Sequence, residues 1–322
     1  MHTTKKGPGG RSGLMNTSAM RGNVQYLQFL LLALPGVMFL LFFNYMPMLG
    51  MIAAFKNYRF TNNFFTSLVN SKWVGFKNFT FLFKTDAFLI TRNTLLYNLA
   101  FIVIGIVVAV TVAIAISELR NRKRGRVYQA ILIFPYYVSW VIAGYMFYAF
   151  LSQDKGLFNH VLAAAGMDPV AWYSETKYWP FILVLCNIWK RMGYESVIYL
   201  AAIQGIPTEL YEAAEVDGAG KWSQILHITL PSLKTIMITM TMMAMGKMFY
   251  SDFGLFYQLP RQSGQLFPVT SVIDTYVYTS LRNSLNIGMA SAAGVYQSIV
   301  GFVLVLLANT VVKKIEKDSA LF

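Results

Sequence analysis

One short polar string in this chain combines side chains and spacings that indicate a function. It lies between two apolar runs and comprises Glu212, Ala213, Ala214, Asp217 and Gly218, followed by Ile228, Leu230 and Pro231. A helix with two alanines at its centre lets a partner approach the backbone closely, and the adjacent carboxylate can pair with a basic residue. Thr208 would cap such a helix, and Gly218 would end it in left-handed geometry before a second short helix. The chemistry that this string predicts is docking to another protein.

A second group consists of charged and aromatic residues within the flanking apolar runs. Its members are Trp189, Lys190, Arg191, Tyr194, Glu195, Lys247, Tyr250 and Asp252. A charged side chain at the centre of a bilayer costs about 2.5–3.5 kcal/mol on insertion scales, so it normally faces a cavity or a partner. These residues are therefore candidates for a polar translocation path. Two local alternatives stay open: Arg191 and Glu195 can pair within one helix, and the basic side chains can snorkel to the interface.

Composition indicates a membrane protein without catalytic machinery of its own. The 322 residues are 56% hydrophobic and 13% charged, with a mean hydropathy of +0.49, whereas soluble domains are about 25% charged. No GxxxxGK[ST], HExxH or GxSxG string occurs, and the three histidines lack metal-ligand spacing. The single Cys186 lies in an apolar stretch and cannot form an internal disulfide. We expect no catalytic residue, no cofactor, no metal and no nucleic acid for this chain.

The apolar runs predict an all-α integral membrane protein with six transmembrane helices. Residues 1–25 form a basic tail with a disordered start, and 26–92 contain the first helix, with Pro35 and Pro47, and an external loop. Residues 93–312 form a core of five helices with a polar loop at 205–234, and 313–322 form a second tail. The five core helices are expected at 93–117, 127–153, 178–204, 235–257 and 283–312. Residues 266–281 are expected to form an external or re-entrant helix.

Charge distribution predicts the topology. Residues 118–126 hold five basic residues and one acid in nine positions, and so dense a short loop belongs in the cytoplasm. Six helices then place the 205–234 loop and both termini in the cytoplasm. The first external loop, with six basic residues against one acid, runs against this trend. The dense loop carries more weight, because longer loops of moderate charge can be translocated.

The whole polar string (Glu-Ala-Ala, a glycine six residues after the glutamate, then Ile-x-Leu-Pro) resembles the coupling loop of type-1 ABC importer permeases. Similar stretches occur at 92–95, 134–137, 187–190 and 288–293, so the resemblance covers roughly residues 93–312. It is closest to the carbohydrate-uptake branch. Residues 74–79 and the segment from Pro35 to Pro47 look most like permeases for pectin- or alginate-type oligosaccharides, including membrane subunits of alginate importers.

The resemblance implies ATP-driven, binding-protein-dependent import across the cell inner membrane by alternating access. It implies a second homologous permease subunit, two cytoplasmic ATPase subunits that bind ATP and Mg, an external solute-binding protein and an acidic oligo- or polysaccharide substrate. Glu212 would contact a basic residue of an ATPase, and the aromatic residues of the second group would stack on sugar rings. A secondary transporter or channel working without an ATPase would show an internal repeat, and no convincing one is found. An intramembrane enzyme would have to use Glu195 and Asp252 as its catalytic groups.

Overall fold

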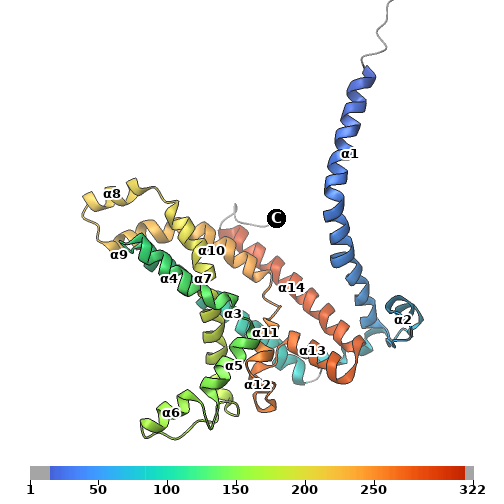
Figure 1. The fold of residues 1–322 in the computed structure, drawn as a ribbon. Coiled ribbons are helices and arrows are strands. Elements are labelled where there is room, and N and C mark those ends of the chain that lie inside the picture. Colours follow the sequence, from blue (N-terminus) through green and yellow to red (C-terminus); the bar gives the residue numbers. More distant parts are fainter. Residues whose placement is uncertain (1–14, 84, 316–322) are drawn as a thin grey trace, which may run out of the picture. The chain divides into compact units, whose positions relative to one another are not determined.

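The computed structural model describes residues 15–83 and 85–315, whose regular elements are helices apart from one isolated bridge between Lys56 and Trp73 (Figure 1). The chain divides into two units, Met1–Ile52 and Ala53–Phe322. The start of the predicted N-terminal tail and most of the predicted C-terminal tail, 313–322, lie outside the described residues.

The N-terminal unit is built on helix α1 (Met15–Leu40), followed by a π-helical turn η1 (Leu41–Tyr45) and a 3₁₀ segment η2 (Met46–Phe55). The sequence prediction placed residues 15–25 in the polar tail, but these residues form the first turns of α1. The 28 residues Gln28–Phe55 are apolar and long enough to cross a membrane, as predicted. Pro47 has no N–H for an α-helical ladder, and the change from π to 3₁₀ geometry occurs beside it.

The second unit contains many helices, of which α7 is the central one. α7 contacts α3, α4 and α10, and α10 in turn contacts α14. In chain order the elements are α2 (Phe64–Asn70), η3 (Gly75–Phe83), α3 (Thr85–Ser117), α4 (Arg122–Tyr137), α5 (Trp140–Leu151), α6 (Leu157–Ala164), η4 (Thr176–Tyr178), α7 (Trp179–Gln204), α8 (Thr208–Val216), α9 (Lys221–Gln224), η5 (Ile225–Thr229), α10 (Leu230–Met245), α11 (Phe253–Gln258), η6 (Gly264–Leu266), α12 (Phe267–Thr270), α13 (Ile273–Ser284) and α14 (Ile287–Ile315).

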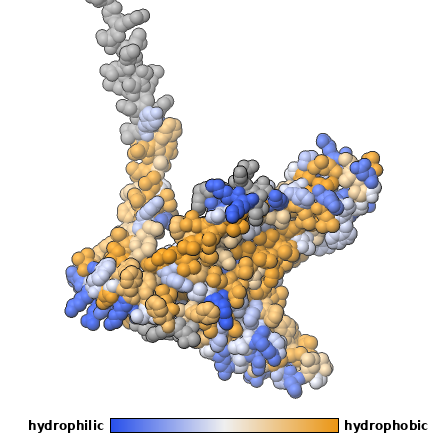
Figure 2. Space-filling view, turned by 180° about the vertical axis from the view of Figure 1, so that it is seen from behind, coloured by the Kyte–Doolittle hydropathy of each residue, from blue (hydrophilic) through white to orange (hydrophobic). Residues whose placement is uncertain are grey.

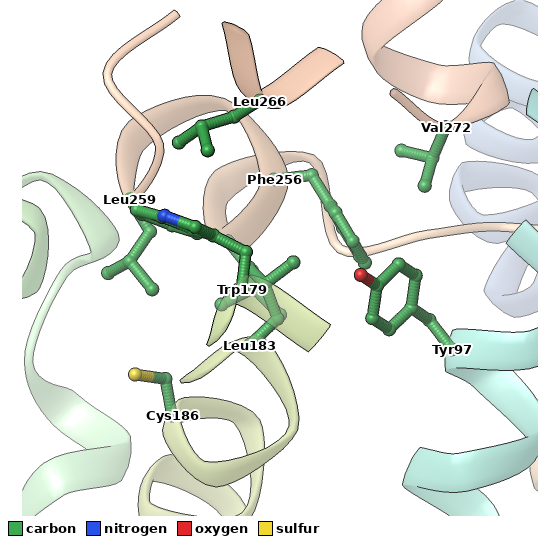
Figure 3. Packing of buried hydrophobic residues seen from close by; sticks show 9 residues of the cluster. Tyr97, Trp179, Leu183, Cys186, Phe256, Leu259, Leu266 and Val272 are labelled. Atoms are coloured by element: carbon green, nitrogen blue, oxygen red, sulfur yellow. The ribbon is translucent and has the colours of Figure 1, made fainter. Parts of the chain in front are cut away.

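The core of this unit joins the first half of α7 to α3 and α11 (Figure 3). Trp179 and Leu183 of α7 are fully buried, and Tyr97 of α3 packs edge-on against Phe256 of α11 at a centroid distance of 5.0 Å. The Trp179 indole N–H donates to the Trp172 carbonyl oxygen over 2.6 Å, so this buried ring keeps its hydrogen bond. α7 is thereby held in a fixed position at its first turn.

Within the described part of the chain, four helical segments are long and apolar enough to cross a membrane: Gln28–Phe55, Ala87–Ser117, Lys221–Met245 and Ile287–Lys314. A fifth is counted if the bent pair α4 and α5 forms one span. α7 has 26 residues but is not among them, and it carries Lys190, Arg191 and Glu195 in its middle. Six spans therefore stay a prediction. The all-helical class is confirmed, and 266–281, which belongs mostly to α12 and α13, is not among the spans.

Three predicted spans differ from the structure. The helix expected at 93 begins at Thr85, so Arg92 lies two turns inside α3. The helix expected at 127–153 is broken, because α4 and α5 meet at 99° and the hydroxyl of Ser139 caps the start of α5. The helix expected at 235–257 ends at Met245, and a new helix, α11, begins after Asp252. The segment that the sequence predicts as the first external loop also contains the helical elements α2 and η3.

Candidate functional site

The predicted docking string forms a helix-turn-helix segment, residues 207–229, which we call the docking arm. Figure 1 shows its helix α8 at one end of the second unit, beyond α7 and α10. α8 has Pro207 at its N-cap and no side-chain cap, so the prediction that Thr208 caps it is wrong by one position. Glu209 lies in the first turn, where a carboxylate favours the positive end of the helix dipole.

The turn between the two helices of the docking arm is closed by backbone hydrogen bonds. Gly218 has a φ of +80°, the left-handed conformation that the sequence predicts. The Ala219 N–H donates to the Ala214 carbonyl over 2.8 Å, and the Gly218 N–H donates to the Glu215 carbonyl over 3.1 Å. This pair of bonds is the Schellman ending of a helix, which satisfies carbonyls that would otherwise be free. The left-handed residue is glycine because a Cβ would strain the backbone there.

Two side-chain contacts brace the docking arm internally, and an ion pair joins it to the rest of the unit. The Tyr211 hydroxyl lies 3.0 Å from that of Thr229, and the buried Gln224 amide donates to the Ala219 carbonyl over 3.2 Å. The Lys221 ammonium lies 3.4 Å from the carboxylate of Glu118, at the start of the basic loop. The docking arm is thus a defined projection and not a loose loop.

The outer surface of the docking arm is uncovered. α8 has no buried residue; Glu212 and Ala213 are exposed and Ala214 is half-buried. Val216 and Trp222 keep 88% and 78% of their surface exposed, so apolar side chains lie beside the acidic ones. Figure 2 shows this mixture of hydrophilic and hydrophobic residues on the projection at the upper right. A surface of this kind is typical of a protein contact.

The end of the docking arm runs into α10 without a break. The π-helical turn η5 precedes Pro231, and the Leu230 N–H donates to the Ile225 carbonyl. Because proline lacks an N–H and its ring crowds the carbonyl four residues before it, a local widening of the helix accommodates it. Ile228 and Leu230 are half-buried and Pro231 is exposed. Leu230 and Pro231 therefore begin α10 inside a helix that is continuous from Lys221.

In the second group of predicted residues, Lys190 holds the bend between α4 and α5. Its ammonium donates to the Pro135 and Tyr136 carbonyls over 3.3 and 3.1 Å, and also to the Val138 carbonyl. It lies 5.1 Å from the centroid of the Trp140 ring as well. Because α4 ends at Tyr137, carbonyls at this end have no backbone N–H of a following helical turn to accept from. The Lys190 ammonium supplies N–H donors in their place.

Most of the other predicted path residues have local partners. The Arg191 guanidinium lies 2.8 Å from the Glu195 carboxylate one turn later, which confirms the alternative of a pair within one helix. The Tyr194 ring stacks on that of Tyr136 at 4.4 Å. Trp189 packs edge-on against Phe147 at a centroid distance of 5.7 Å.

The sequence predicts that Lys247, Tyr250 and Asp252 lie within a helical span. The structure instead places all three between α10 and α11. Lys247 and Tyr250 are exposed in the segment between α10 and α11. The Asp252 carboxylate accepts the indole N–H of Trp140 over 2.8 Å and the backbone N–H of Leu255 over 3.2 Å. Asp252 therefore fixes the start of α11 against α5.

Sequence reasoning missed an arginine close to this group. Arg261 follows α11, and its guanidinium carbon lies 4.0 Å from the centroid of the Tyr148 ring and 5.4 Å from that of Tyr145. Arg261 lies outside the long apolar runs, and the two tyrosines lie more than a hundred positions earlier in the chain, so no local pattern indicates the contact.

Comparisons with known proteins agree on one family. Residues 102–317 match the family described as "Binding-protein-dependent transport system inner membrane component". The chain is 32% identical to the polygalacturonan/rhamnogalacturonan transport system permease protein YteP of Bacillus subtilis (strain 168), over 92% of this chain and 91% of that protein. It is 28% identical to the arabinooligosaccharides transport system permease protein AraP of the same organism, over 73% of this chain and 75% of that protein. Its fold matches a chain in the crystal structure of a bacterial alginate ABC transporter in complex with alginate pentasaccharide-bound periplasmic protein, with a TM-score of 0.81, 29% identity, and coverage of 94% of this chain and 98% of that chain.

Proposed function

The chain belongs to the family of inner membrane components of binding-protein-dependent transport systems, and from this premise we propose that it carries an acidic oligo- or polysaccharide into the cell by ATP-driven alternating access. It is a multi-pass ABC importer permease for sugars, a class of membrane subunit without catalytic residues. The acidic substrate is supported by two neighbours, one named for polygalacturonan and the other for alginate.

The observation that carries the mechanism is the docking arm, which is uncovered along α8 yet fixed at its base. We assign it the role of the coupling element. Two cytoplasmic ATPase subunits bind ATP and Mg. An ATPase subunit also binds α8, with one of its basic side chains in contact with Glu212. Closure of the ATPases moves the docking arm, and the helical core rocks as a rigid body against a second permease subunit. An external solute-binding protein delivers the sugar. In this arrangement the chain crosses the membrane six times and has both termini in the cytoplasm.

The test is purification of the tagged chain from its native membrane with its co-purifying subunits, followed by ATPase assays with neutral and acidic oligosaccharides. We expect an ATPase to co-purify and acidic oligosaccharides to stimulate it. Glu212→Ala and Gly218→Asp should insert into the membrane normally, but the complex should hydrolyse ATP without driving uptake. Glu212→Ala removes the carboxylate that contacts the ATPase, and Gly218→Asp disrupts the left-handed turn after α8. Uptake that continues in the absence of any ATPase, or unchanged coupling in Gly218→Asp, would overturn the proposal.

A further inference from the structure

A small hollow of about 220 Å³ lies where α5 meets the segment after α11. Tyr145, Tyr257, Gln258, Arg261 and Gln262 line it. Figure 1 shows α5, α11 and α12 on the side of the unit away from α8, so under the proposed topology the hollow opens toward the outside of the cell. The volume is below that of pockets for drug-sized ligands and fits a ligand no larger than a single sugar ring.

Arg261 gives this hollow a solvent-exposed positive charge. Its guanidinium lies over the rings of Tyr148 and Tyr145, a contact that holds the plane of the group but leaves its N–H edge for another acceptor. Among the side chains that the structure describes, no carboxylate forms an ion pair with Arg261. A guanidinium with its face fixed and its edge unpaired suits a bidentate carboxylate.

The backbone holds Arg261 in an unusual conformation. Arg261 and Gln262 have φ values of 53° and 56°, so two consecutive residues other than glycine adopt the left-handed region. The loop is anchored on both sides of them by Tyr173. The Tyr173 hydroxyl donates to the Leu259 carbonyl over 3.4 Å, and the Ser263 hydroxyl donates to the Tyr173 carbonyl over 2.8 Å. Strain that the surroundings maintain in this way is typical of ligand-binding positions.

A second arginine supports the opposite wall. Arg282 of α13 donates to the Tyr257 hydroxyl oxygen over 2.7 Å, which leaves the O–H of Tyr257 as a donor to a ligand. Tyr145 keeps 66% of its surface exposed and offers a ring on which a sugar can stack. The hollow therefore combines a positive charge, an aromatic face, a hydroxyl donor and the Gln262 amide.

We propose that this hollow binds one carboxylate-bearing sugar unit of the transported chain, with Arg261 on the carboxylate and Tyr145 against the sugar ring. The inference rests on the proposed import function and names the charged group of its substrate. Selectivity for acidic sugars then resides in Arg261 and not in the basic residues of α7, which have local partners.

The experiment uses the complex that co-purifies with this chain, placed in nanodiscs of zwitterionic lipid, and measures binding of labelled tetragalacturonate and of its neutral methyl ester. The two probes differ at the carboxyl groups alone, where the ester removes the negative charge and adds a methyl group. For Arg261→Gln we expect affinity for tetragalacturonate to fall about tenfold, as for the loss of a charged hydrogen bond, while affinity for the ester is unchanged. Arg261→Lys should recover part of the loss, and Arg59→Gln, a change at an exposed external arginine outside the hollow, should have no effect.

Each other outcome counts against the inference. Equal losses for the acid and the ester would show that Arg261 acts on structure and not on charge. An effect that appears only when anionic lipid is added would make Arg261 a lipid ligand, and failure of Arg261→Gln to assemble would make it a subunit contact. Stimulation of the wild-type ATPase by neutral sugars alone would refute the acidic site and leave the importer intact. The absence of any co-purifying ATPase would refute the importer itself.

Discussion

Lys190 and Arg191 are adjacent basic residues of α7 with different predicted contributions to stability. Lys190→Met removes the ammonium but keeps an unbranched apolar side chain. The Pro135 carbonyl keeps a partner, because the Val138 N–H donates to it over 3.1 Å. The Tyr136 and Val138 carbonyls, however, lose the donor that the described part of the chain gives them. The bond to Val138 is part-buried and the bond to Tyr136 is exposed, so the first costs about 1–2 kcal/mol and the second less. Lys190→Met should therefore lower the free energy of unfolding by about 1–3 kcal/mol.

Arg191→Met is the matched control. Arg191 pairs with Glu195 one turn away, and its side chain is 53% exposed, so the loss should stay below about 1 kcal/mol. The measurement is tryptophan-detected unfolding of the two purified variants in the same detergent, followed by binding of acidic sugars to those that fold. Equal costs for the two changes would show that Lys190 does not cap the bend. A Lys190→Met variant that keeps full stability but loses sugar binding would show that Lys190 faces the substrate.

Three further predictions concern the docking arm, the α4–α7 contact and the half-buried Asp274. Gly218→Ala should reduce transport per ATP hydrolysed, because a left-handed alanine costs about 1–2 kcal/mol; Gly220→Ala, where φ is −71° and space is also open, should not. Gly193→Ala should abolish folding or lower the unfolding temperature sharply in a thermal scan, since its Cβ would overlap a backbone carbonyl of α4, whereas Gly294→Ala, with nothing within 4 Å, should be tolerated. Burial raises the pKa of Asp274 above its ordinary value, and backbone and side-chain hydrogen bonds lower it in part. The Asp274 carboxyl therefore keeps its proton to higher pH in the folded state than in the unfolded state. The stability that this protonated carboxyl contributes is complete below about pH 3.8 and is lost as pH rises through the folded pKa. Asp274→Asn should flatten that decline when unfolding temperature is measured against pH; an unchanged slope would assign it to other groups.

The parts of the fold that the sequence predicts are those that depend on local residues. The end of α8 at Gly218 was predicted because glycine is the residue that adopts a positive φ without strain. α7 and α14 begin within a few residues of the expected positions, since a charge or turn-forming residue marks each boundary.

The bend between α4 and α5 was not predicted because its cause is distant in sequence. Residues 127–153 carry no charge, so hydropathy gives one continuous span. The donor that makes the break tolerable is Lys190, more than fifty positions later. The same distance explains the candidate path, because Lys190 and Asp252 have partners on α4 and α5 that no periodicity could indicate.

The bend also constrains how the protein is made. α4 and α5 have 16 and 12 residues, about 24 and 18 Å of helix, so each is shorter than the roughly 30 Å hydrocarbon layer. The carbonyls of Tyr136 and Val138, at the bend, accept hydrogen bonds from the Lys190 side chain. Lys190 leaves the ribosome more than fifty residues after them. During synthesis, the uncharged residues 127–151 should therefore stay in one continuous helix and bend only after α7 has been inserted beside them.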